Sequence, residues 1–340
     1  MLIIKKLLVF FIDTYNVNKR GEEYRDGMFE YKNWWKSNLD EQWFTHFIKR
    51  NNLNVDSAIV FYSLFGPCDV LDEKNCKKKV FYTGENVTHR VHHSRLRERS
   101  EKVLPLDNRI SKYENYLKKG TMDLVLTFCP DGLDNAIRFP YWLLSHFDEC
   151  SSYSDVKKRI MQIETNYHKV NLSRRGAVNI SSHDFFGTRA DICDSLDGIV
   201  DIKYAGRWRN NTDELQTKYG NCKIEYLSNF RFNICPENMD AKDYVTEKIW
   251  DSFEAGCIPI YSGALGNPEP NIFNKEAFFL WSYDSGNECL VKQIQKAEYD
   301  DMFYCEMKRK NVFVDGAAEY IYSLLKGFRD KMESLMGDYE

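Results

Sequence analysis

Residues Phe230–Gly263 read FRFNICPENMDAKDYVTEKIWDSFEAGCIPIYSG. The segment divides into four predicted elements: a strand at Phe230–Cys235, a polar loop at 236–243, a helix at Tyr244–Ala255 and a strand at Cys257–Tyr261. Val245, Ile249 and Phe253 recur every four residues and define the buried face of the helix. Gly256 is the expected helix stop, because glycine adopts a left-handed backbone without steric cost. This pattern predicts an α/β fold with a parallel sheet.

The polar loop and the first turn of this helix occupy the place where parallel sheets bind ligands. In such sheets ligands lie at the carboxyl ends of the strands, and the free N–H groups of a helix N-terminus favour phosphate. Lys248 can neutralise a diphosphate there, and Glu247 can accept hydrogen bonds from ribose hydroxyls. The alternative is that Glu247 and Lys248 are only the exposed start of a helix.

Strands and helices also alternate on the N-terminal side of this segment. The first half of the chain predicts a strand at Lys6–Asp13, a helix at Asp40–Asn51 and further strands at Ala58–Phe65, Val80–Tyr82 and Met122–Phe128. A second array begins near Arg175, with a strand at Ala177–Ile180, a helix at Ala190–Leu196 and a strand at Ile199–Tyr204. Two such arrays predict two doubly wound sheets.

The length of 340 residues fits two domains of roughly 150 residues each. We expect one domain at residues 1–155, a second at 156–310 and a helical tail at 311–340, in which Tyr320, Leu324 and Phe328 share one face. The charged segment Glu149–Arg174 has no long apolar run and is predicted to be the linker.

Composition and charge exclude several classes of protein. The net charge of −4 argues against a protein that coats nucleic acid, since such domains carry a basic face. The ten cysteines form no C-x-x-C pair, which indicates reduced thiols in a cytosolic protein. The apolar run Leu7–Ile12 is far shorter than the roughly 20 residues that cross a bilayer, and it ends without a cleavage site. We therefore expect a cytoplasmic protein without a transmembrane anchor.

Several motifs resemble the signature of the α1,3/4-fucosyltransferases, glycosyltransferase family 10. The strongest are three runs in the segment quoted above, at Asn233–Met239, Asp243–Trp250 and Ala255–Gly263. Val80–Asn86, VFYTGEN, is similar to the acceptor-side segment of short bacterial members. Weaker similarities are Asn33–Trp35, the Ala177–Ser181 strand and Arg189 ahead of its helix. The resemblance extends from about residue 30 to about residue 290.

This resemblance implies a GT-B fold, in which two Rossmann-like domains face a central cleft and the C-terminal domain binds the donor. It implies that Arg189 and Lys248 bind the diphosphate of GDP-fucose. By the same carry-over, the ribose, base or fucose would be held by Asn238, Tyr244 and Glu247.

Glu85 matches the catalytic base proposed for the family; taken without that match, it is better explained as a turn residue that follows a strand beside Gly84. GDP-fucose is a β-linked donor and the family's products are α-linked, so one carboxylate suffices to take the acceptor proton. Two cations at the diphosphate would stabilise the charge on the departing GDP. The chain has no Asp-x-Asp motif of the kind that holds a divalent ion on a nucleotide sugar. We therefore expect neither an essential metal nor another cofactor.

Other features leave the acceptor open. The family implies the 3-hydroxyl of N-acetylglucosamine or glucose in a glycan, but Pro236 stands where members usually have an aromatic residue, and the sequence after Gly263 differs. The basic cluster at residues 88–99 could face an acidic glycan or the diphosphate, or could be a solvated surface. The alternatives are a GT-B transferase for another nucleotide sugar and a catalytically inactive glycan-binding protein. Retention of Glu85, Arg189 and the Glu247–Lys248 pair favours an enzyme.

Overall fold

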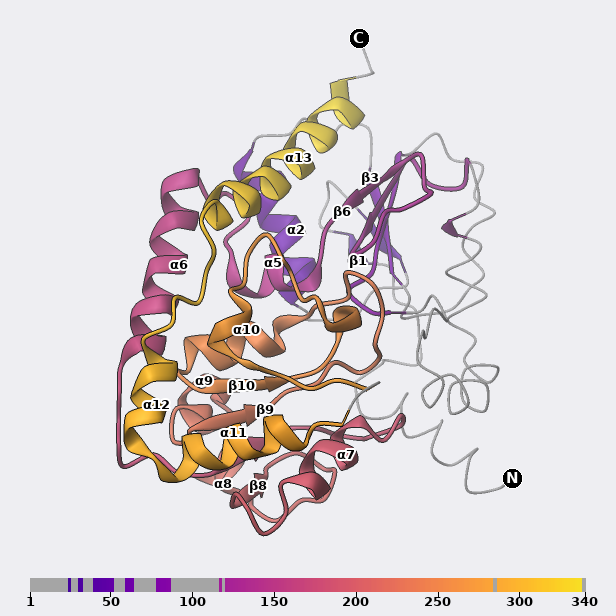
Figure 1. Ribbon diagram of the computed structural model, residues 1–340. Coiled ribbons are helices and arrows are strands. Elements are labelled where there is room, and N and C mark those ends of the chain that lie inside the picture. Colours follow the sequence, from indigo (N-terminus) through magenta and orange to yellow (C-terminus); the bar gives the residue numbers. More distant parts are fainter. Residues whose placement is uncertain are drawn as a thin grey trace, which may run out of the picture. The chain divides into compact units, whose positions relative to one another are not determined.

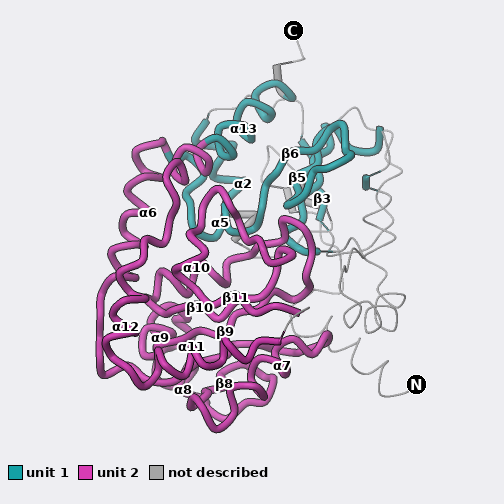
Figure 2. Tube along the Cα trace, viewed as in Figure 1, with its two compact units in different colours: residues 1–89, 101–151, 323–340 teal, residues 90–100, 152–322 magenta. Residues whose placement is uncertain are grey.

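The computed structural model describes residues 24–25, 30–32, 39–51, 59–63, 78–86, 116–117, 120–283 and 286–337. The chain forms two compact units (Figure 2). Unit 1 comprises Met1–His89, Glu101–Ser151 and Ser323–Glu340, and unit 2 comprises Arg90–Ser100 and Ser152–Tyr322. The predicted strand at 6–13, the motif at 33–35 and the basic cluster at 88–99 lie outside the described residues.

Unit 1 contains a sheet in which the strands follow one another in sequence order, β1 to β6. The strands are β1 (Tyr24–Arg25), β2 (Glu30–Lys32), β3 (Ile59–Tyr62), β4 (Lys78–Tyr82), β5 (Leu124–Thr127) and β6 (Ala136–Arg138). Only the β1–β2 pair is antiparallel. Every residue of β3 and β5 is buried, as expected for strands covered on both faces. The strands predicted near 58–65, 80–82 and 122–128 are confirmed.

Aromatic side chains form much of the core of unit 1. They come from α2 (Leu39–Arg50), from the strands and from the end of α13 (Ala317–Gly337). The ring centroids of Phe47 and Phe328 lie 4.6 Å apart, and those of Phe44 and Phe61 lie 5.1 Å apart. The buried stripe of α13 consists of Ile321, Leu325, Phe328 and Met332. The predicted helix is confirmed: Phe328 is buried, and Tyr320 and Leu324, which precede it by two turns and one turn, are half-buried.

Unit 2 contains an all-parallel sheet with a change of direction in its strand order. The order is β11-β10-β9-β7-β8, with β7 at Ala177–Asn179, β8 at Ile202–Tyr204, β9 at Phe232–Ile234, β10 at Ile258–Tyr261 and β11 at Phe279–Leu280. From β7 the chain proceeds outward to β8, and from β9 it proceeds the other way to β10 and β11. The carboxyl ends of β7 and β9 therefore flank a topological switch point, where such sheets bind ligands.

Two helices follow the strands at this switch point. They are α7 (Thr188–Ser195), after β7, and α10 (Glu247–Glu254), after β9. Crossovers between parallel strands are right-handed, and the chain moves in opposite directions along the sheet after β7 and after β9. α7 and α10 therefore lie on opposite faces of the sheet, as Figure 1 shows. The N-termini of both helices therefore meet the same edge of the sheet.

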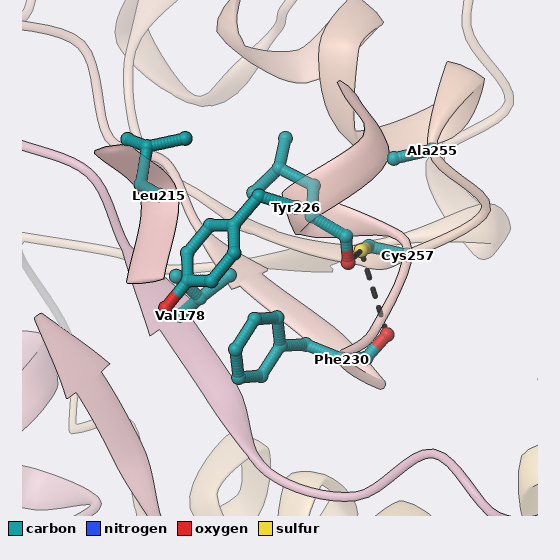
Figure 3. Packing of buried hydrophobic residues seen from close by; sticks show 7 residues of the cluster. Val178, Leu215, Tyr226, Phe230, Ala255 and Cys257 are labelled. Carbon is teal, nitrogen blue, oxygen red and sulfur yellow. Dashed lines mark hydrogen bonds between the residues drawn. The ribbon is translucent and has the colours of Figure 1, made fainter. Parts of the chain in front are cut away.

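A compact apolar cluster supports the sheet beside β7 and β9 (Figure 3). Val178 of β7 packs there with Tyr226, Phe230 and Cys257. The Cys257 thiol lies 3.0 Å from the Leu227 carbonyl oxygen and 3.5 Å from that of Phe230, and it donates to them. Burial raises the pKa of Cys257 to about 12, so this thiol stays protonated. The cysteines of the described residues are free thiols, as the sequence predicts.

The segment predicted to be a linker, 149–174, is mostly the helix α6 (Tyr153–His168). A capping box begins it: Ser152 accepts from the Asp155 N–H, and Asp155 accepts from the Ser152 N–H. Only Val156, Ile163 and Tyr167 are buried, and α6 packs against α10 with this narrow stripe. The linker prediction is wrong because the many charged residues of the exposed face hide a short apolar repeat.

The remaining elements are short helices and 3-10 turns around this sheet, together with α5 in unit 1. They are α5 (Tyr141–His146), α8 (Glu214–Thr217), α9 (Lys223–Leu227), η2 (Ala264–Gly266), η3 (Lys275–Ala277), α11 (Glu288–Tyr299) and α12 (Asp301–Lys308). Within the described ranges, none of the helices has both the length and the hydrophobicity needed to cross a membrane.

A buried lysine of α12 lies beside the C-terminal end of α10. Lys308 is 0% exposed; its Nζ donates to the Gly256 carbonyl oxygen at 2.6 Å and lies 3.9 Å from the centre of the Tyr167 ring. Gly256 has a positive φ of 76°, and a Cβ there would approach the Asn166 carbonyl oxygen to 2.9 Å. Burial lowers the pKa of Lys308 from 10.5 to about 7.

Lys308→Met is expected to change how stability depends on pH. Because the pKa of Lys308 is lower in the folded chain, the unfolded chain binds more protons between about pH 7 and pH 10.5. The wild-type protein should therefore gain stability relative to the variant as the pH rises through this window, by up to about 1.4 kcal/mol per pH unit. Urea denaturation across the window measures this, and a pH-independent difference between the two proteins would contradict it.

Candidate functional site

Five side chains that the sequence singles out lie in unit 2, around the carboxyl ends of β7 and β9. They are Arg189, Asn238, Tyr244, Glu247 and Lys248. Arg189 is the second residue of α7, and Lys248 is the second residue of α10. Both helix starts differ from the prediction, which placed Arg189 ahead of its helix and began the later helix at Tyr244. Residue 246 keeps an extended backbone, with φ −110° and ψ −162°, so α10 begins only at Glu247.

Arg189 joins the loops that follow the two strands. Its side chain is buried at 5% exposure, with one guanidinium nitrogen donating to the His183 carbonyl oxygen at 2.7 Å and the other to Asn238 Oδ1 at 2.8 Å. Its buried Nε has no acceptor among the described residues. Asp184 accepts from the backbone N–H groups of Arg189 and Ala190 and so caps α7. An anion at this helix therefore meets the guanidinium rather than free helix N–H groups.

Lys248 is held by a buried carboxylate that the sequence analysis missed. Lys248 Nζ lies 3.0 Å from Glu237 Oε2 and 2.7 Å from Thr246 Oγ1, and it donates to both. Burial favours the neutral amine, but the charges of Glu237 and Glu247 outweigh it and raise the pKa of Lys248 above its ordinary value. Lys248 is therefore an ammonium at neutral pH, with 19% of its side chain exposed to a ligand.

Glu247 and its neighbours form a second set of opposite charges. Glu247 Oε1 lies 3.7 Å from Lys223 Nζ and 3.9 Å from Lys248 Nζ, and Lys223 Nζ lies 2.6 Å from Asp251 Oδ2. Burial raises the pKa of Glu247, but the two lysines more than offset this and hold the pKa below its usual value. Glu247 is therefore an ionised acceptor, with 27% of its side chain exposed.

Tyrosines complete this end of the sheet. Tyr244 is 1% exposed and lies within electrostatic range of Arg189. Tyr283 accepts a hydrogen bond from Thr188 Oγ1 at 3.1 Å, and burial raises its pKa to about 12. Tyr244 therefore offers little surface to a ligand in this structure.

Sequence reasoning found Lys248 but not the residues that hold it. Glu237 follows Pro236 in the loop after β9, where it looks like an ordinary loop acid. The one local signal is Thr246, a residue type favoured immediately before a helix. Gly263 leaves the space that the Glu237 side chain occupies, because a Cβ at residue 263 would approach Glu237 Cγ to 2.8 Å.

Glu85 lies in unit 1, just beyond the carboxyl end of β4. Its N–H donates to Thr83 Oγ1 at 3.0 Å, which forms a tight turn, and its side chain is half-buried between the buried residues Thr83 and Asn86. A Cβ at Gly84 would come within 2.7 Å of the Tyr141 ring, so the turn requires glycine. The turn interpretation and the base interpretation of Glu85 are compatible, since the turn fixes where the carboxylate begins.

A comparison with protein families matches residues 170–309 to the C-terminal region of glycosyltransferase family 10 (fucosyltransferase). The match covers less than half of the chain and lies entirely within unit 2. The matched region includes the whole sheet of unit 2 together with Arg189, Asn238, Tyr244, Glu247 and Lys248. The resemblance that the motifs predict is confirmed for this region.

Curated relatives match shorter stretches. α-(1,3)-Fucosyltransferase B of Drosophila melanogaster is 34% identical over 94 residues, which are 27% of this chain and 20% of the relative. α-(1,3)-Fucosyltransferase FucT of Helicobacter pylori is 32% identical over 138 residues, 39% of this chain and 28% of the relative. GDP-fucose protein O-fucosyltransferase 3 of Xenopus tropicalis is 31% identical over 85 residues, 24% of this chain and 17% of the relative. The chain thus matches less than a third of each relative's length.

A solved structure matches nearly the entire chain. The crystal structure of an α1,3-fucosyltransferase with GDP-fucose superposes with a TM-score of 0.61 at 21% identity, covering 97% of each chain. The chain therefore has the fold of that crystal structure, and the predicted α/β GT-B fold class is confirmed.

Proposed function

We propose that this protein is an inverting fucosyltransferase, which moves L-fucose from GDP-β-L-fucose to a hydroxyl group of a glycan and forms an α-fucoside. The observation that carries the proposal is the pair of largely buried cations, Arg189 and Lys248, at the switch point of the unit 2 sheet. Both are fixed by hydrogen bonds before any ligand binds. The similarity to named fucosyltransferases supports GDP-fucose as the donor.

The roles follow from what each side chain offers. Arg189 and Lys248 would contact the diphosphate, and their charge would stabilise the negative charge that gathers on GDP as the bond to fucose breaks. Preorganised cations act more strongly on the transition state than on the bound donor, because the charge grows during the reaction. Glu247, ionised and partly exposed, would accept hydrogen bonds from ribose. Asn238 would contact the sugar or the base through its amide.

Inversion needs one carboxylate to take the proton of the acceptor hydroxyl, and we assign this role to Glu85. The acceptor oxygen attacks C1 of fucose from the face opposite GDP; the C1–O bond to the diphosphate breaks, and the acceptor proton passes to the carboxylate. Arg189 and Lys248 supply the positive charge that a divalent metal supplies in other nucleotide-sugar enzymes. The proposed reaction therefore needs no metal and no cofactor.

The first acceptor that we propose is the 3-hydroxyl of N-acetylglucosamine or glucose in a glycan. Relatives named as α-(1,3)-fucosyltransferases support this choice, and a relative named as a protein O-fucosyltransferase makes a protein hydroxyl the second acceptor to test.

Incubation with GDP-fucose, EDTA and a panel of acceptors tests the proposal. N-acetyllactosamine, lactose and a serine- and threonine-containing peptide provide the two acceptor classes, and mass spectrometry detects the gain of one deoxyhexose. We expect transfer to a β-galactoside and an α-anomeric signal in the proton NMR spectrum of the product. Transfer from GDP-mannose or UDP-galactose, but not from GDP-fucose, would replace the proposal with a different donor. GDP binding without any transfer would instead favour an inactive glycan-binding protein.

A further inference from the structure

Glu237 is a fully hydrogen-bonded carboxylate at the carboxyl edge of the unit 2 sheet. It is 2% exposed and accepts hydrogen bonds from four donors. Oε1 accepts from the Thr246 N–H at 2.8 Å and from Tyr261 Oη at 3.2 Å; Oε2 accepts from Thr246 Oγ1 at 2.7 Å and from Lys248 Nζ at 3.0 Å. Two bonds to each oxygen use the acceptor capacity of a carboxylate fully.

Thr246 closes a ring between this carboxylate and Lys248. Its hydroxyl donates to Glu237 Oε2 and accepts from Lys248 Nζ at 2.7 Å. Its backbone N–H, immediately before α10, is bonded to the same carboxylate. Glu237 therefore fixes both the lysine ammonium and the start of the helix that carries it. Two of the three ammonium hydrogens have acceptors in the described part of the chain, which leaves the third for a ligand oxygen.

Lys248 of α10 and Lys308, the last residue of α12, show together what this carboxylate changes. Lys308, beside the C-terminal end of α10, is buried against a carbonyl oxygen and an aromatic ring, and burial lowers its pKa to about 7. Lys248, at the N-terminal end of α10, is also largely buried, but its pKa is raised. Burial acts against the charged form of both, so the difference comes from the carboxylates beside Lys248.

We infer that Glu237 is a positioning residue that holds the Lys248 ammonium charged and correctly placed for the donor diphosphate. The inference rests on the proposed function, since it assigns Lys248 to a diphosphate. Glu237 itself, with 0% of its side chain exposed, does not reach the ligand and acts through the lysine.

Other charged groups around Lys248 also affect its protonation. Glu247, on the same helix, favours the ammonium, whereas Arg189 of α7 opposes it. Lys223 of α9 lies beside Glu247 and weakens its effect, and Tyr261 of β10 bonds to Glu237. Glu237 is the nearest of the carboxylates to Lys248 Nζ, at 3.0 Å against 3.9 Å for Glu247, so its removal should have the largest effect.

The test is the pH dependence of GDP binding by Glu237→Gln, measured by isothermal titration calorimetry. Glutamine is similar in size but carries no charge, so Lys248 should lose its proton at a lower pH. We expect the ratio of the Kd of the variant to that of the wild type to rise with pH above neutrality, by at most about tenfold per pH unit while the lysine deprotonates. The ionisations of GDP itself cancel in this ratio. A merely structural role would give a ratio that does not change with pH.

Two controls separate position from general damage. Glu298→Gln removes another buried carboxylate of unit 2, which accepts from the Gly176 N–H at 2.9 Å and is far in sequence from α10; its Kd ratio should stay constant with pH. In a Lys248→Met background, Glu237→Gln should produce no pH-dependent ratio, because the titrating group is gone. If Glu237→Gln does not fold, Thr246→Val removes the hydroxyl between the two residues and should change the ratio in the same direction.

A constant ratio for Glu237→Gln, or the same pH dependence in the Lys248→Met background, would overturn the role of Glu237. Failure of the proposed function would look different, because the wild-type protein itself would not bind GDP. Binding of GDP by the wild type with a constant ratio would therefore remove the positioning role alone.

Discussion

Glu85→Gln is expected to lower kcat for fucosyl transfer by roughly 10²- to 10⁴-fold, the usual contribution of a general base. Glutamine has nearly the same shape but cannot take a proton. The tight turn at Thr83 and Gly84 depends on backbone and ring contacts that the substitution leaves in place. The Kd for GDP should be unchanged, because the hydrogen bonds that hold Arg189 and Lys248 come from unit 2. Initial rates with GDP-fucose, together with calorimetry, measure both quantities.

Asp123→Asn is the matched control for Glu85→Gln. Asp123 is an exposed carboxylate immediately before β5, and its Oδ2 accepts from the Lys79 N–H at 2.7 Å, at the amino ends of the same strands. Ligands lie at the opposite edge of such a sheet, so this variant should keep the wild-type kcat. An unchanged kcat in Glu85→Gln would show that Glu85 takes no part in the reaction. Equal losses of kcat in Glu85→Gln and Asp123→Asn would show that Glu85 has only a structural role.

Lys248→Met is expected to weaken GDP binding by roughly 10- to 150-fold, because a hydrogen bond to a charged group contributes about 1.5–3 kcal/mol. The effect should lie toward the upper end of that range. Glu237 would lose its cationic partner and remain as a buried carboxylate close to the diphosphate. The rate of transfer at saturating donor should fall as well, since the charge on departing GDP would lose a cation. Calorimetric titration with GDP measures the first effect.

Lys308→Met serves as the control for Lys248→Met, since it removes a buried lysine of α12 whose Nζ donates to Gly256, just after the end of α10. It should change stability but leave the Kd for GDP within about twofold of the wild type. An unaltered Kd for GDP in Lys248→Met would contradict the diphosphate role. An equal loss in both variants would show that removing a buried lysine beside α10 affects the site through stability alone.

Much of unit 2 follows from local sequence. The alternation of apolar and polar residues in Phe230–Gly263 predicts β9, α10 and β10 within a few residues of their observed bounds. The pair Glu247–Lys248 is likewise placed at a helix start because strand, loop and helix follow one another directly. The linker prediction for 149–174 is wrong because only three residues of α6 are buried, which is too few for a clear apolar pattern in the sequence.

The sequence by itself determined the α/β class, the parallel strands and the presence of Lys248 at the first turn of a helix, because each depends on residues close together in the chain. Only the tertiary structure decided that Arg189 bonds to Asn238, 49 residues away, and that Tyr261 and Lys248 converge on Glu237 from 24 and 11 residues away. The spacing of apolar residues shows which face of an element is buried. It does not show which polar side chains form hydrogen bonds with one another at the edge of a sheet. The charge of the largely buried Lys248 depends on such a contact, the one with Glu237.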